Sequence, residues 1–77
     1  MVKSTKIKNS MRTLRFMANE MTQAALAEKI NMTRQTVIAI EQGRYSPSLE
    51  SAFLIAKALG ATLEDVFQYD EEAGSPD

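Results

Sequence analysis

The fold of this 77-residue chain is constrained most by two short helical stretches that a three-residue turn separates. Residues 23–30 and residues 34–42 each carry apolar side chains at helical spacing, and Asn31-Met32-Thr33 lies between them. Helices of about eight residues are marginal in water unless they bury an apolar face against another element. The two helices must therefore cross and share one interface.

The side chains of this pair fit such a crossing. The apolar residues expected inside are Leu26, Ile30, Met32, Val37 and Ile40, with Ala27 as the small side chain that lets the two backbones approach. Asn31 is expected to take the left-handed conformation that ends the first helix, because Asn tolerates it better than most residues. The pattern predicts a helix-turn-helix, which leaves Arg34, Gln35, Thr36 and Ala39 on the outer face of its second helix.

The rest of the chain adds three more predicted helices, which makes the fold class all-α. They span residues 9–18, 49–59 and 63–67, and the expected N-caps are Thr22, Thr33, Ser48 and Thr62. Residues 5–8 and 67–69 alternate in polarity and are candidates for short strands. We expect an N-terminal arm or short strand at 1–8, a helix-turn-helix domain at 9–67, and a short strand with an acidic flexible tail at 68–77.

Composition excludes several classes of function. The chain contains no Cys and no His, so it has no disulfide, no thiolate or imidazole metal site and no nucleophile–imidazole pair. Glu41 lacks a second carboxylate at helical spacing and is expected to be a structural acceptor. The longest apolar run, residues 52–56, is far too short to span a bilayer. We therefore expect a cytoplasmic protein that is not an enzyme and uses no cofactor or metal.

Charge is distributed unevenly along the chain, although the net charge is only −1. Residues 1–63 hold nine basic and four acidic side chains, whereas residues 64–77 hold six acidic side chains and no basic one. The body is therefore basic and suited to an anionic partner. The acidic end either raises solubility or repels DNA and confines binding to the opposite face.

Three segments resemble one family of DNA-binding proteins. Residues 22–27 (TQAALA), 31–37 (NMTRQTV) and 40–49 (IEQGRYSPSL) are similar to the Xre/Cro-type repressors, and more closely to their short single-domain branch, the cytolysin-regulator-like repressors. The resemblance implies a five-helix lambda-repressor-like fold, a third helix in the DNA major groove and a homodimer on an inverted-repeat operator. It also implies a two-stranded antiparallel ribbon between residues 5–8 and 67–69. The chain differs from the family at Asn19-Glu20 and Asn31, where Gly is common.

The resemblance places Arg34, Gln35 and Thr36 at the base-reading positions, with Ala39 on the same face. Side-chain chemistry independently agrees with this placement. Arg matches the paired acceptors of guanine, Gln matches the donor and acceptor of adenine, and the Thr methyl group can contact thymine.

The resemblance also implies contacts to the DNA backbone. Gln23 corresponds to a glutamine that contacts a phosphate and often supports a base contact. Thr33 corresponds to a helix cap that reaches the DNA phosphate backbone. Arg44 and Tyr45 follow the third helix, where a cation and a phenol hydroxyl suit phosphate oxygens. The alternative to a phosphate contact is that Tyr45 packs beside the fourth helix. We expect Arg12 and Arg15 in solvent, with Arg12 or Lys8 reaching flanking phosphates as the alternative.

Partners follow from these assignments. We expect double-stranded DNA and a second copy of the chain, with Phe67 and Tyr69 at the dimer interface because an isolated two-stranded ribbon is marginal in water. A different reading is an antitoxin-like module that neutralises a partner protein, with DNA binding secondary.

Overall fold

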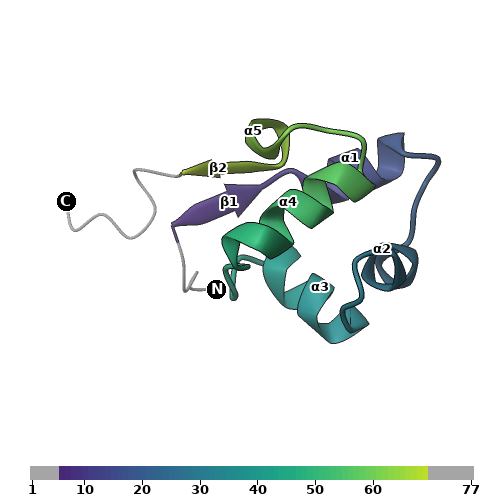
Figure 1. The fold of residues 1–77 in the computed structure, drawn as a ribbon, viewed down its shortest axis with the longest axis horizontal. Helices are drawn as coiled ribbons and strands as arrows, with labels where there is room; N and C mark the ends of the chain where they lie inside the picture. Colours follow the sequence, from purple (N-terminus) through teal and green to yellow (C-terminus); the bar gives the residue numbers. More distant parts are fainter. Residues whose placement is uncertain (1–5, 70–77) are drawn as a thin grey trace.

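The computed structural model describes residues 6–69, which form five helices and two short strands (Figure 1). In chain order the elements are β1 (Ile7–Asn9), α1 (Met11–Met17), α2 (Gln23–Lys29), α3 (Arg34–Glu41), α4 (Leu49–Ala58), α5 (Leu63–Val66) and β2 (Phe67–Tyr69). The two strands pair at one end of the molecule, beside α5, and α2 and α3 lie toward the other end (Figure 1). The predicted five helices and antiparallel ribbon are confirmed.

Side-chain caps fix where four of the helices begin. Hydroxyl oxygens of the four expected N-caps, Thr22, Thr33, Ser48 and Thr62, accept hydrogen bonds from backbone N–H groups three residues later. Thr62 completes a reciprocal capping box, because the Asp65 carboxylate accepts the Thr62 N–H at 3.2 Å. Asn31 has φ 58° and ends α2 in the left-handed conformation, as predicted.

The prediction of where the first helix begins is wrong. The helix begins at Met11 and not at residue 9, because Asn9 belongs to β1 and pairs with Phe67. The Asn9 side chain bonds on both sides: its Oδ1 accepts the Met11 N–H at 3.1 Å, and its Nδ2 donates to the Ile40 carbonyl at 2.9 Å. The ribbon is thus tied directly to the end of α3.

The N-terminal strand is also displaced from its predicted range. It occupies Ile7–Asn9 instead of 5–8, and residue 5 lies outside the described residues. Ile7 pairs with Tyr69 and Lys8 with Gln68 in antiparallel register. The other predicted helices end one residue earlier in the structure, a difference within the fraying of helix ends.

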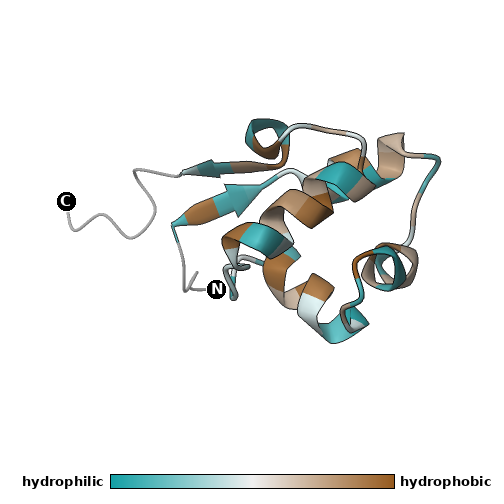
Figure 2. Ribbon diagram, in the orientation of Figure 1, coloured by the Kyte–Doolittle hydropathy of each residue, from teal (hydrophilic) through white to brown (hydrophobic). Residues whose placement is uncertain are grey.

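A single apolar cluster holds the helices together. Its buried members are Met11, Leu26, Ala27, Ile30, Val37, Ile40, Ile55, Ala56, Leu59 and Val66. All the predicted core residues of α2 and α3 are among them except Met32, which is partly buried and packs against the cluster. Figure 2 shows apolar residues of α3 and α4 toward the centre of the molecule, whereas the first turn of α3 is hydrophilic. None of the helices within residues 6–69 is long and apolar enough to cross a membrane.

Candidate nucleic-acid interface

The first turn of α3 presents the predicted base-reading side chains on the surface. Arg34 and Gln35 are exposed, and Thr36 and Ala39 are half-buried. The opposite face of the helix carries Val37, which is fully buried in the core. Core packing therefore fixes the helix by one face and leaves the other face outward.

Thr36 is oriented by its neighbour. Its hydroxyl lies 2.9 Å from the Thr33 hydroxyl, and its backbone N–H donates to the Thr33 Oγ1 at 3.1 Å. Thr33 thus caps α3, and its hydroxyl also forms a hydrogen bond with the Thr36 hydroxyl.

A polar cleft of about 630 Å³ lies beside this helix face. Side chains from α1, α2 and α3 line it, among them Arg12, Arg15, Gln23, Arg34 and Glu41. Three guanidinium groups and one carboxylate give the cleft an excess of positive charge. A cleft of this kind suits an anionic chain such as a DNA backbone.

An ion pair between two residues that line the cleft joins α1 to α3. Arg15 Nε donates to Glu41 Oε2 at 2.6 Å and Arg15 Nη2 donates to Glu41 Oε1 at 3.1 Å. The two side chains are 13% and 9% exposed. The prediction that Arg15 lies in solvent is therefore wrong, whereas Glu41 is confirmed as a structural acceptor. Sequence patterns miss this pair because the two residues are 26 positions apart.

Two further hydrogen bonds extend the ion pair. Arg15 Nη1 donates to the Met21 carbonyl at 2.8 Å and so holds the link between α1 and α2. Gln23 Nε2 donates to Glu41 Oε1 at 3.1 Å. The structure thus connects Gln23, a predicted DNA-contacting residue, to a carboxylate that the sequence analysis did not associate with DNA.

Arg44 and Tyr45 follow the C-terminal end of α3 and are both exposed. Gly43, at φ 76°, turns the chain after the helix, and the Arg44 N–H donates to the Ala39 carbonyl at 3.0 Å. Eight helical residues span about 12 Å, so these two side chains lie about that far along the axis from the first turn of α3. Their contact with DNA stays a prediction.

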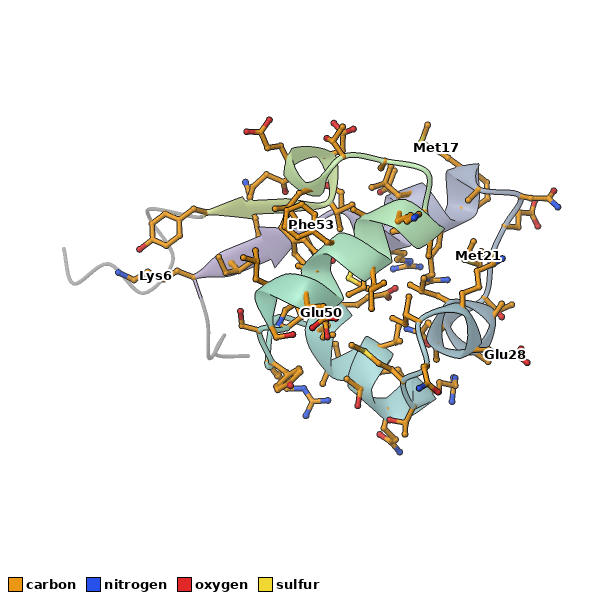
Figure 3. The ribbon with its side chains drawn as sticks, in the orientation of Figure 1. Lys6, Met17, Met21, Glu28, Glu50 and Phe53 are labelled. Carbon is orange, nitrogen blue, oxygen red and sulfur yellow. The ribbon has the colours of Figure 1, made fainter. Side chains whose placement is uncertain are left out.

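A second, apolar surface lies near the ribbon. A groove of about 370 Å³ runs between the start of α4 and the ribbon, and its lining includes Ile7, Leu49, Ala52, Phe67 and Tyr69. Tyr69 is 60% exposed and Phe67 is half-buried. On α4, Phe53 and Leu54 are also exposed, and Figure 3 shows Phe53 projecting from that helix. Among residues 6–69, none lines both this groove and the polar cleft.

Nothing within residues 6–69 forms a site for a metal ion. No group of three or more acidic side chains there converges in a way that could hold one. Each buried side-chain nitrogen and oxygen in the described part of the chain has a hydrogen-bond partner. The exposed face of α3 and the adjoining cleft are therefore the candidate site.

Comparison with known proteins agrees with this site. Residues 11–66 match the helix-turn-helix family. An HTH-type transcriptional regulator of Methanocaldococcus jannaschii is 47% identical over 66 residues, which are 86% of this chain and 98% of that protein. The immunity repressor of Bacillus phage phi105 is 46% identical over 41 residues, 53% of this chain and 28% of the repressor. The crystal structure of the clp gene regulator ClgR from Corynebacterium glutamicum is 29% identical with a TM-score of 0.65, and it covers 71% of this chain and 57% of ClgR.

A helix-turn-helix with an exposed polar turn on its second helix, beside a basic cleft, defines a DNA-binding transcriptional regulator and not an enzyme. The chain belongs to the Xre-type helix-turn-helix family, and its five helices form the lambda-repressor-like fold. The resemblance found in the sequence is thus confirmed at the level of family and fold.

Proposed function

We propose that this regulator is a repressor that binds an inverted-repeat operator as a homodimer, with α3 in the major groove. The observation that carries the proposal is the exposed first turn of α3, which core packing holds rigidly from the opposite face. The N-terminal residues of a recognition helix are those that reach base edges in a helix-turn-helix. The shape of the site therefore supports base reading by this turn.

The side chains of that turn give specific expectations for the bases. The Arg34 guanidinium suits guanine O6 and N7, and the Gln35 amide suits adenine N6 and N7. The Thr36 hydroxyl forms one hydrogen bond with Thr33, and its methyl group can contact a thymine methyl group. Ala39, one turn further along α3, adds a small apolar surface on the same side.

Contacts to the DNA backbone are proposed for the residues around this turn. They are Gln23 at the start of α2, Thr33 at the cap of α3, and Arg44 and Tyr45 beyond the end of α3. Arg12, exposed on α1 and lining the polar cleft, is close enough to the same face to join them. Such contacts release counterions, so binding should weaken steeply as salt is raised.

The apolar groove beside the ribbon supports a dimer. Exposed aromatic and aliphatic side chains that are grouped on one surface are typical of protein interfaces. We assign Phe67 and Tyr69 to the contact between two copies, and Phe53 extends the same surface. Two α3 helices about 34 Å apart would then read half-sites about 10 bp apart, centre to centre. Similarity to an immunity repressor supports repression as the outcome. Since the regulator acts on DNA, we propose a cytoplasmic location.

Selection of duplexes from a random DNA library at moderate salt, with protein mass measured on the same sample, tests the whole proposal. An enriched inverted repeat and a mass of two chains support the dimeric repressor. Salt-sensitive binding without an enriched motif contradicts it and favours the protein-interaction module. That alternative rests on the acidic tail, and residues 70–77 lie outside the described residues.

Two substitutions separate base reading from backbone binding. Gln35→Ala should relax preference at one base position, at a cost of about 1 to 3 kcal/mol for the preferred sequence. Arg44→Ala should weaken binding to all sequences alike and reduce the salt slope by about one. If Gln35→Ala leaves the whole preference unchanged, α3 does not read the bases as proposed.

A further inference from the structure

We propose that Ile38 is a specificity-determining residue of α3, whose side chain packs against the C5-methyl group of a thymine in the operator. This inference rests on the proposed DNA-binding function, in which α3 lies in the major groove. It adds to the base-reading surface an aliphatic residue beyond the first turn of the helix.

Ile38 is the branched apolar residue of α3 that the core does not explain. Val37 is fully buried and Ile40 is 1% exposed, and both belong to the apolar cluster. Ile38 is half-buried. Among residues 6–69, it belongs neither to that cluster nor to the partly buried apolar side chains that pack against it. Ile also forms helices less readily than Ala, so helix propensity does not account for it either. Its position therefore points to a contact outside the core.

Residue spacing places Ile38 on the outward face of α3. Side chains three or four positions apart lie on the same face of a helix. Ile38 follows Arg34 by four positions and Gln35 by three, and it precedes Gln42 by four. All three of these side chains are exposed, and Arg34 and Gln42 also line the polar cleft. Ile38 thus lies among the side chains that face DNA in the proposed complex.

The chemistry of the side chain limits what it can recognise on DNA. An aliphatic group has no hydrogen-bond donor or acceptor, so it offers nothing to a phosphate oxygen or to the polar edge of a base. The apolar group that bases present in the major groove is the C5-methyl group of thymine. Burial of one such group corresponds to about a fourfold gain in affinity. Ile38 should therefore favour thymine at one position of each half-site.

Distance along α3 restricts which thymine this is. A helix rises 1.5 Å per residue, so Ile38 lies about 6 Å beyond Arg34 along the axis. Neighbouring bases of one strand are about 3.4 Å apart. The thymine should therefore lie within about two base pairs of the base that Arg34 reads. Thr36 is two positions from Ile38, and residues at that spacing do not share a helix face, so its methyl group should meet a different base.

Replacement of thymine by uracil in the selected operator tests the contact, because uracil lacks the methyl group and pairs in the same way. Each thymine of one half-site is replaced in turn, and affinities are measured for the wild type, Ile38→Ala and Met17→Ala. Met17 is 72% exposed on α1 and does not line the polar cleft, so it is a matched control for the loss of an apolar side chain (Figure 3).

One uracil should weaken binding by the wild type and by Met17→Ala about fourfold and leave binding by Ile38→Ala unchanged. Selection with Arg34→Ala identifies the base that Arg34 reads, and the sensitive thymine should lie within about two base pairs of it. Ile38→Val keeps a branched side chain and should reduce the uracil penalty, which keeps the test open if Ile38→Ala does not fold.

Two results would overturn the inference and leave the proposed function intact. One is a selected motif without thymine within two base pairs of the base that Arg34 reads. The other is a set of uracil penalties that is the same in the wild type and in the Ile38 variants. If the wild type selects no motif at all, the contact of Ile38 fails together with the proposed function.

Discussion

Replacing Glu20 by Gly should stabilise the protein, although it removes a side chain. Glu20 lies in the link between α1 and α2 and has φ 55°, and its neighbour Asn19 has φ 62°. Asn tolerates this left-handed conformation, whereas Glu gains nothing there from its side chain. The Glu20 N–H donates to the Phe16 carbonyl at 2.9 Å, and Gly retains that N–H.

Two opposing terms set the magnitude. The left-handed conformation costs a residue with a Cβ about 1 to 2 kcal/mol, which Gly avoids. Gly has more freedom in the unfolded chain, and this costs roughly 0.5 to 1 kcal/mol on folding. The free energy of unfolding should therefore rise by about 0.5 to 1 kcal/mol, which corresponds to a Tm increase of roughly 4 °C in a domain of this size.

Urea unfolding followed by circular dichroism measures this difference, and Glu28→Gly is the matched control. Glu28 is exposed, lies within α2 and projects away from the body (Figure 3), so its replacement removes the same charge from a helical position. That change should lower the free energy of unfolding by about 0.5 to 1 kcal/mol. Equal destabilisation by both substitutions would refute the argument from backbone conformation.

Four more substitutions test the core, the ion pair and its charge. Leu26→Ala, at a fully buried position, should lower the free energy of unfolding by about 2 to 5 kcal/mol, whereas Leu54→Ala, at a position 44% exposed, should cost less than about 1 kcal/mol in the same urea assay. Arg15→Leu leaves the Glu41 carboxylate buried without its cation and should cost about 2 to 4 kcal/mol. Glu41→Gln keeps the shape of the side chain and one acceptor for Arg15, so it should cost clearly less in thermal unfolding. The opposite order would show that the negative charge of Glu41 contributes more to stability than the cation of Arg15 does.

Local sequence signals predicted the starts of α2, α3, α4 and α5 because each of these starts depends on nearby residues. A Thr or Ser hydroxyl caps the backbone three residues away, and Asn31 ends α2 through its own conformation. Residue spacing also identified the buried faces of α2 and α3, since helical periodicity alone sets which side chains point the same way. The same periodicity predicted that the first turn of α3 is exposed, because side chains that do not point toward the core point toward solvent.

Contacts between distant segments were not predictable in this way. Asn9 was assigned to a helix because its pairing with Phe67 and its bond to the Ile40 carbonyl depend on residues more than 30 positions away. Arg15 was assigned to solvent because an Arg interleaved with the apolar residues of an amphipathic helix carries no sign of a partner on α3. Gln23 was identified as a DNA contact by resemblance, but its bond to Glu41 became visible only in the fold.

The ribbon makes the backbone of residues 7–69 almost a closed ring. Ile7 and Tyr69 face each other at the open ends of two antiparallel strands, in the geometry that a two-residue turn such as Asn-Gly normally connects. In the natural order, pairing these strands closes a loop of about 60 residues, at a cost near 3 to 4 kcal/mol of chain entropy. A circular permutant that joins Tyr69 to Ile7 through such a turn and opens the chain between Asn19 and Glu20 would make the ribbon a local hairpin. The permuted chain would assemble the same helix pair from a different order of folding events, with its new ends on the exposed link between α1 and α2.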